Sequence, residues 1–151
     1  MSVLIIAFVV GVACGLRALV GLAAVSWAAS SGRLPLQETW LAFVGFRATP
    51  IVTSLLAIFE LVTDKLPKTP SRLVPPQFGA RIAMGALTGA AIGASQGHLL
   101  MGVLPGIVGS ILGTLGGSKA RAAAARLFGR DLPAALLEDV VAIALVFLAL
   151  H

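Results

Sequence analysis

The stretch VLIIAFVVGVACGLRALVGLAAVSWAA, residues 3–29, decides the class of fold. It is about 27 residues long, and a helix of about 20 apolar residues crosses a ~30 Å hydrocarbon layer. Its one charged residue is Arg17, and a guanidinium near mid-membrane depth costs at least ~2.5–3.5 kcal/mol. We therefore expect a membrane span in which Arg17 faces protein or water and not lipid.

The composition of the whole chain supports the same class. Of its 151 residues, 58% are hydrophobic and 11% are charged, whereas soluble domains carry roughly 25% charged residues. We expect a single all-α transmembrane domain, a polytopic bundle with glycine-rich packing. The one cysteine, Cys14, lies inside the first apolar stretch, which excludes a disulfide framework and a cysteine metal site.

The charge of the chain is explained by membrane topology better than by nucleic-acid binding. The net charge is +5, but no stacking aromatic residues accompany the basic ones. We therefore expect no nucleic acid, no metal and no cofactor, and we expect anionic lipid headgroups as partners of the basic loops.

Five apolar segments predict about five spans, with two basic loops between them. Loops 64–80 and 118–132 carry most of the Lys and Arg, which favours the cytoplasmic side for both. With alternating spans, the N-terminus is then cytoplasmic and the C-terminus lies outside, in a bacterial inner membrane. The predicted spans are 3–29, 40–63, 81–95, 99–117 and 133–150, and the basic residues are Lys65, Lys68, Arg72, Arg81, Lys119, Arg121, Arg126 and Arg130.

Glycines at every fourth position form two ridges in the third and fourth spans. Small residues at this spacing let helix backbones approach closely in lipid. We expect both ridges to face other helices, in this chain or in a second copy of a homo-oligomer, and Ile92 to lie on the opposite face. The ridges are Gly85, Gly89, Gly93 and Gly97, then Gly109, Gly113 and Gly117.

A short internal echo links the first and fourth spans. Residues 11–18 and 113–120 share the pattern Gly-x-x-x-Gly-x-(Arg/Lys)-Ala. On alternating spans the two copies run in opposite directions, as in the inverted repeats of transporters. Chance similarity between glycine-rich segments is the alternative explanation.

Charged residues within or beside the spans are the candidates for an ion or solute path. Intramembrane charges are costly and often mark ion or proton paths. We expect the four acidic ones in the inner part of the membrane, and Arg17 and Arg47 in its outer half. The alternative is structural: carboxylates at helix termini, and Arg17 bonded to the ends of broken helices. The candidates are Glu60, Asp64, Glu138, Asp139, Arg17, Arg47, Lys65 and Arg81.

Three motifs together resemble a known family. They are Gly15-Leu-Arg-Ala18, the run Glu60-x-x-x-Asp-Lys-x-Pro-x-x-Pro-x-Arg72, and Arg81-x-x-x-Gly-Ala86. They are similar to a family of small bacterial membrane proteins catalogued as a domain of unknown function, family 4126. The resemblance implies an integral inner-membrane protein, and it implies no substrate and no catalytic residue.

The function that these observations favour is a channel or transporter for an ion or small solute. A non-transporting assembly subunit or lipid-binding scaffold is the alternative, favoured by the basic loops. We expect no enzymatic activity, because the sequence shows no pair of nucleophile and base and no cofactor motif.

Overall fold

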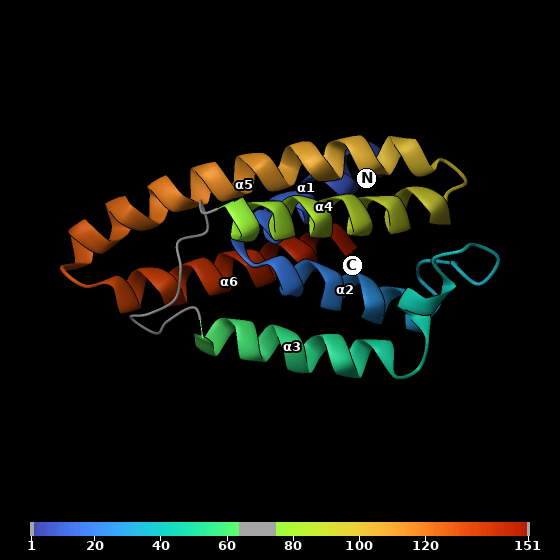
Figure 1. Ribbon diagram of the computed structural model, residues 1–151, viewed down its shortest axis with the longest axis horizontal. Coiled ribbons are helices and arrows are strands. Elements are labelled where there is room, and N and C mark those ends of the chain that lie inside the picture. The colour runs from blue at the N-terminus through green and yellow to red at the C-terminus, as the bar shows by residue number, and fades with distance from the viewer. Residues whose placement is uncertain (1, 64–74, 151) are drawn as a thin grey trace.

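The computed structural model describes residues 2–63 and 75–150, without the side chain of Asp131, and every regular element in this part is a helix (Figure 1). The expected all-helical fold is confirmed for these residues. The elements are α1 (Val3–Leu16), α2 (Ala18–Ser30), the short 3₁₀ helix η1 (Ala42–Gly45), α3 (Thr49–Thr63), α4 (Pro75–Ser95), α5 (Leu99–Phe128) and α6 (Asp131–Leu150).

The first apolar stretch forms a helical hairpin and not the single span expected for residues 3–29. Arg17 has φ −142° and ψ 107°, an extended conformation that ends α1 and starts α2. The two helices then lie antiparallel, so that Gly21 of α2 lies against Cys14 and Val10 of α1. The expectation of one span was wrong because apolar composition gives the length of a stretch and not the point where it reverses.

Glycines bring α4, α5 and α1 into close contact. A Cβ atom on Gly89 would overlap the carbonyl oxygen of Gly102, and one on Gly113 would overlap that of Val12. Gly85 and Gly93 also lie against α5, and Gly109 lies against Phe8 of α1. Backbones can approach this closely only where side chains are missing, so α1, α4 and α5 pack together with each helix in contact with the other two.

Two predictions about the glycine ridge of α4, those for Gly97 and Ile92, were wrong. Gly97 belongs to the turn after α4, where its φ of +77° favours glycine, and it has no close neighbour. Ile92 was expected on the face opposite the ridge, but it is only 1% exposed and belongs to the core. Gly117 is half-buried in α5.

The hairpin changes the direction of α1 relative to the rest of the bundle. Gly11 packs on Gly106 and Gly15 packs on Ser110, so α1 and α5 run in parallel. The predicted inverted repeat of residues 11–18 and 113–120 was therefore wrong, because its two copies do not run in opposite directions. Figure 1 shows both chain ends away from the turn between α5 and α6, the side of the bundle on which the N-terminus was expected.

Three predicted boundaries also change. The segment 40–63 is divided into η1 and α3, and α4 begins at Pro75, where prolines fit the first turn of a helix. Residues 118–128, expected as part of a loop, continue α5. Alanines 122–125 favour the helix, and Gly129, at φ +75°, ends it.

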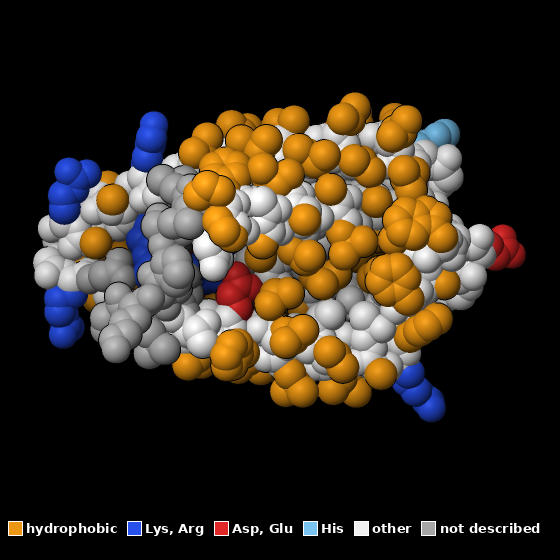
Figure 2. All heavy atoms as spheres, in the orientation of Figure 1, with side chains coloured by type: hydrophobic (Ala, Val, Ile, Leu, Met, Phe, Trp, Pro, Cys, Tyr) orange, Lys and Arg blue, Asp and Glu red, His pale blue; other side chains and the backbone are white. Residues whose placement is uncertain are grey.

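Large apolar side chains cover much of the surface. Figure 2 shows them over most of the visible face, while Lys and Arg side chains gather mainly at the end where α5 and α6 meet. We call this the basic end, and it carries Lys119, Arg126 and Arg130. Helices α5 and α6 are long and apolar enough to cross a membrane, whereas α1, α2 and α3 are shorter apolar helices.

Candidate functional site

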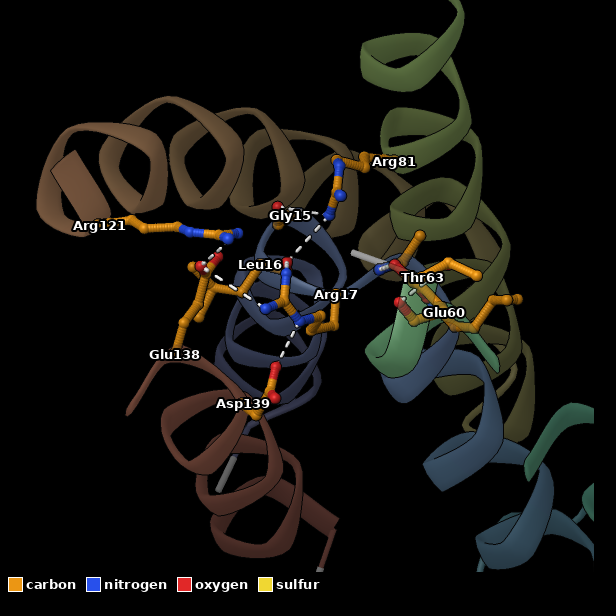
Figure 3. A network of polar contacts seen from close by, with 11 residues as sticks. Gly15, Leu16, Arg17, Glu60, Thr63, Arg81, Arg121, Glu138 and Asp139 are labelled. Carbon is orange, nitrogen blue, oxygen red and sulfur yellow. Dashed lines mark hydrogen bonds and ion pairs between the residues drawn. The ribbon is translucent and has the colours of Figure 1, made fainter. Parts of the chain in front are cut away.

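Arg17 lies at the reversal between α1 and α2 and is fully buried. Its Nε donates a hydrogen bond to Asp139 Oδ1 over 2.6 Å, and its Nη2 lies 3.9 Å from Glu138 Oε2. Its Nη1 donates to the carbonyl oxygen of Leu16 over 3.3 Å. Figure 3 shows the guanidinium between the turn and the two carboxylates of α6. One side chain therefore joins the tip of the hairpin to α6.

The start of α2 is held by Glu60 of α3. The first amide groups of a helix have no partner within it and carry partial positive charge. Glu60 accepts hydrogen bonds from the amide of Ala18 over 2.9 Å and from that of Leu19 over 2.8 Å, one on each carboxylate oxygen. The Glu60 carboxylate thus accepts the hydrogen bonds that carbonyl groups of the preceding turn would accept if the helix were not broken at Arg17.

The end of α1 is held by Arg81 of α4, which is 4% exposed. The last carbonyl groups of a helix also have no partner within it. Arg81 Nη1 donates to the carbonyl oxygens of Gly15 over 3.1 Å and Leu16 over 3.0 Å (Figure 3). Thr114 of α5 adds a hydroxyl donor to Gly15, over 3.3 Å. The two helix ends at the break are therefore bonded by charges of the complementary sign.

Arg121 is the most exposed member that α5 and α6 contribute. Its Nη1 lies 3.6 Å from Glu138 Oε2, and its side chain is 16% exposed, against 6% for Glu138. The two residues line a cavity of about 120 Å³ between α5 and α6, next to Leu16 and Gly117. Glu138 therefore lies between this cavity and the buried Arg17.

We call these six charged side chains the Arg17 network. Three are basic and three acidic, and each contacts the hairpin or another member. Isolated buried charges cost several kcal/mol each, and pairing with hydrogen bonds offsets this cost. The members are Arg17, Glu60, Arg81, Arg121, Glu138 and Asp139.

A family model, described as Domain of unknown function (DUF4126), matches residues 4–151. The chain belongs to this family. Comparisons with curated proteins and with solved structures find no match. The match to DUF4126 includes the whole hairpin and the carboxylates of α6, so the Arg17 network lies within the segment that defines the family.

The structure brings together five of the eight residues predicted for an ion or solute path in this DUF4126 chain. Arg17, Glu60, Arg81, Glu138 and Asp139 meet at the hairpin tip. The prediction that Arg17 lies in the opposite half from the acidic residues was wrong, because the reversal of α1 and α2 carries it to them.

Of the other three predicted residues, only Arg47 lies in the described part of the chain. Arg47 is exposed just before α3, and Gly45, two residues earlier, packs on Ala29 at the end of α2 away from Arg17. Asp64 and Lys65 lie outside the described residues. The prediction missed Arg121, which was assigned to a loop. Its helical spacing from Gly117 and Ala124, which line the same cavity, is the signal that could have indicated its side.

Proposed function

We propose that this chain is an integral membrane protein in which α3 to α6 cross the bilayer and the α1–α2 hairpin enters without crossing it. Apolar side chains are exposed on several helices, where lipid would cover them. The hairpin reverses at Arg17, which is fully buried and bonded to Asp139 of α6, so its tip lies within the bundle. Examples of the exposed side chains are Leu55 and Phe59 on α3, Leu104 and Leu112 on α5, and Val140 and Leu148 on α6.

The basic end then lies in the cytoplasm by the positive-inside rule. Both ends of the described chain lie on the other side, because the hairpin adds two helices and no crossing. This arrangement keeps the predicted cytoplasmic position of the 118–132 region. It replaces the predicted cytoplasmic N-terminus with an external one.

Within this arrangement the protein moves a small ion, a proton or a monovalent cation. The observation that carries the proposal is the chain of charges from the cavity at Arg121, through Glu138, to the buried pair of Arg17 and Asp139. Intramembrane carboxylates and interrupted helices are features that transport proteins use. Glu138 and Asp139 are the ion-handling groups.

The tasks proposed for these two carboxylates differ because their contacts differ. Asp139 has the short hydrogen bond to Arg17, whereas Glu138 lies 3.9 Å from that guanidinium and contacts the cavity. A proton or cation entering from the cavity therefore reaches Glu138, which lies beside Arg121, before it reaches Asp139. Neutralising Glu138 removes one of the two carboxylates beside the Arg17 guanidinium and so weakens the hold on its Nη2 end.

Flux measurements test this proposal. The purified protein is reconstituted in liposomes that contain a pH-sensitive dye, and a potassium diffusion potential drives ion entry. We expect proton or monovalent cation flux above that of empty liposomes. Flux of anions alone, or no flux in protein that is folded and inserted, would contradict it.

A non-transporting assembly or scaffold subunit is the second candidate. The observation that favours it is that the Arg17 network has equal numbers of acidic and basic members. In this alternative the network serves only to hold the hairpin. A stoichiometric partner protein in mild-detergent purification, together with absent flux, would support this alternative. Association into a homo-oligomer stays a prediction for either function.

A further inference from the structure

A second cavity lies between α2 and α6, outside the Arg17 network. Its volume is about 410 Å³, within the range of small-molecule sites. Its walls are apolar along most of their length, and Ser31 and Arg33 supply the polar groups at one end. The lining residues are Val20, Ala24, Trp27, Ala28, Ser31, Arg33, Ile143, Val146, Phe147 and Leu150.

Trp27 lies at the middle of the cavity wall and is itself held in place. The indole Nε1 donates a hydrogen bond to Ser54 Oγ of α3 over 2.8 Å, which holds the ring in one orientation. The helical rise between Val20 and Ser31 corresponds to about 17 Å. The cavity is therefore an elongated apolar groove with a polar, positively charged end.

We propose that this groove binds one acyl chain of an anionic phospholipid, with the headgroup phosphate at Arg33. An elongated apolar site with a cation at one end matches an amphiphile that carries one negative charge. The N–H groups of a guanidinium donate the hydrogen bonds that phosphate oxygens accept, and the Ser31 hydroxyl, which donates to the carbonyl oxygen of Ala28 over 3.1 Å, makes this end of the groove polar. The proposal rests on the membrane location proposed above and is independent of ion movement.

The position of Arg33 indicates which leaflet of the membrane supplies the lipid. Arg33 follows α2, at the end of the bundle away from the basic end, so the bound lipid belongs to the outer leaflet of the membrane. Its acyl chain extends toward Val20, three residues from Arg17. The lipid would thus separate the network from the surrounding bilayer on the α2–α6 side.

Tryptophan quenching tests the proposal, because the chain has only two tryptophans. In a Trp40→Phe protein, Trp27 alone reports on the groove. Liposomes contain a low fraction of phosphatidylglycerol or phosphatidylcholine with brominated acyl chains, which quench an indole on contact. We expect about fivefold tighter association of the anionic lipid, as for one basic residue at an anionic headgroup.

Two variants and one control define the outcome. Arg33→Gln should abolish the lipid preference, whereas Arg47→Gln, at another exposed arginine, should keep it. Ala24→Phe should fill the groove and reduce quenching by both lipids at an unchanged melting temperature. Inorganic phosphate should not compete, and full competition by it would contradict use of the apolar groove.

The failures of the two proposals are distinguishable. Equal quenching by both lipids, or an Arg33→Gln protein that keeps the preference, would overturn the lipid site. Absence of quenching by either lipid in reconstituted protein would overturn the membrane location itself. Failure of the lipid site leaves the proposal of ion movement standing, because the flux measurements test that proposal separately.

Discussion

Arg17 and Asp139, 122 positions apart in the sequence, are joined by a 2.6 Å hydrogen bond between Nε and Oδ1 inside the bundle. Arg17 is fully buried and Asp139 is 8% exposed. The pair connects the hairpin tip to α6, the helix that also carries Glu138. The position of the proposed ion-handling groups therefore depends on the reversal of the chain between α1 and α2.

Replacing one member of this pair should destabilise the protein more than replacing both. Arg17→Met or Asp139→Leu alone leaves the opposite charge buried, which costs about 3–5 kcal/mol. The double variant removes both charges and should regain a large part of that loss. Unfolding in detergent, measured as a double-mutant cycle, checks this. Additive losses would show that the two side chains do not interact.

Glu60 should stabilise the start of α2. Glu60→Ala removes the acceptor for two amide groups, and the loss of a helix N-cap costs about 0.5–2 kcal/mol. Glu38→Ala is the matched control, because Glu38 is an exposed carboxylate outside the network. Melting temperatures should fall only for the first variant. Equal melting temperatures would refute the capping role.

Close contact between α4 and α5 should make Gly89 intolerant of a side chain. Gly89→Leu forces the backbones of the two helices apart and should cost several kcal/mol or prevent folding. Gly116→Leu is the control, since a Cβ atom at Gly116 has no neighbour within 4 Å. Yield and melting temperature of the two variants should differ strongly. Similar values would mean that the glycine contact is incidental.

The proposed topology predicts which positions are labelled from each side of the membrane. In a Cys14→Ser protein, cysteines at Ser2 and Arg33 should react with an impermeant reagent from outside. A cysteine at Arg126, at the basic end, should react only from the cytoplasm. Labelling of positions 2 and 126 from the same side would contradict the hairpin topology.

The helices and most members of the site were predictable from local sequence, but the reversal at Arg17 was not. Apolar runs indicated helices, and charges within or beside these runs indicated Glu60, Glu138, Asp139 and Arg81 as members. The break is stabilised by Glu60 and Arg81, which lie more than 40 positions further along the chain. No periodicity within residues 3–29 reports on such distant partners.

Arg121 was missed for a related reason. Its neighbours suggested a basic loop, whereas the four alanines that follow it continue α5 as a helix. The side of α5 on which it lies is fixed by the packing of α6, through Glu138. Similarly, the sequence indicated glycine ridges, but only the packed helices show that α5 contacts α4 and α1 with neighbouring faces.

The most direct test of ion movement through the Arg17 network is proton and cation flux in liposomes that contain the Glu138→Gln protein. Glutamine keeps the size of the side chain and removes its charge and its ability to bind a proton. Glu38→Gln, the same change at an exposed position, is the control. We predict at least about a tenfold loss of flux for Glu138→Gln, as typical for removal of a group that transfers protons, and unchanged flux for Glu38→Gln. Equal flux in the two folded, equally reconstituted variants would contradict the account.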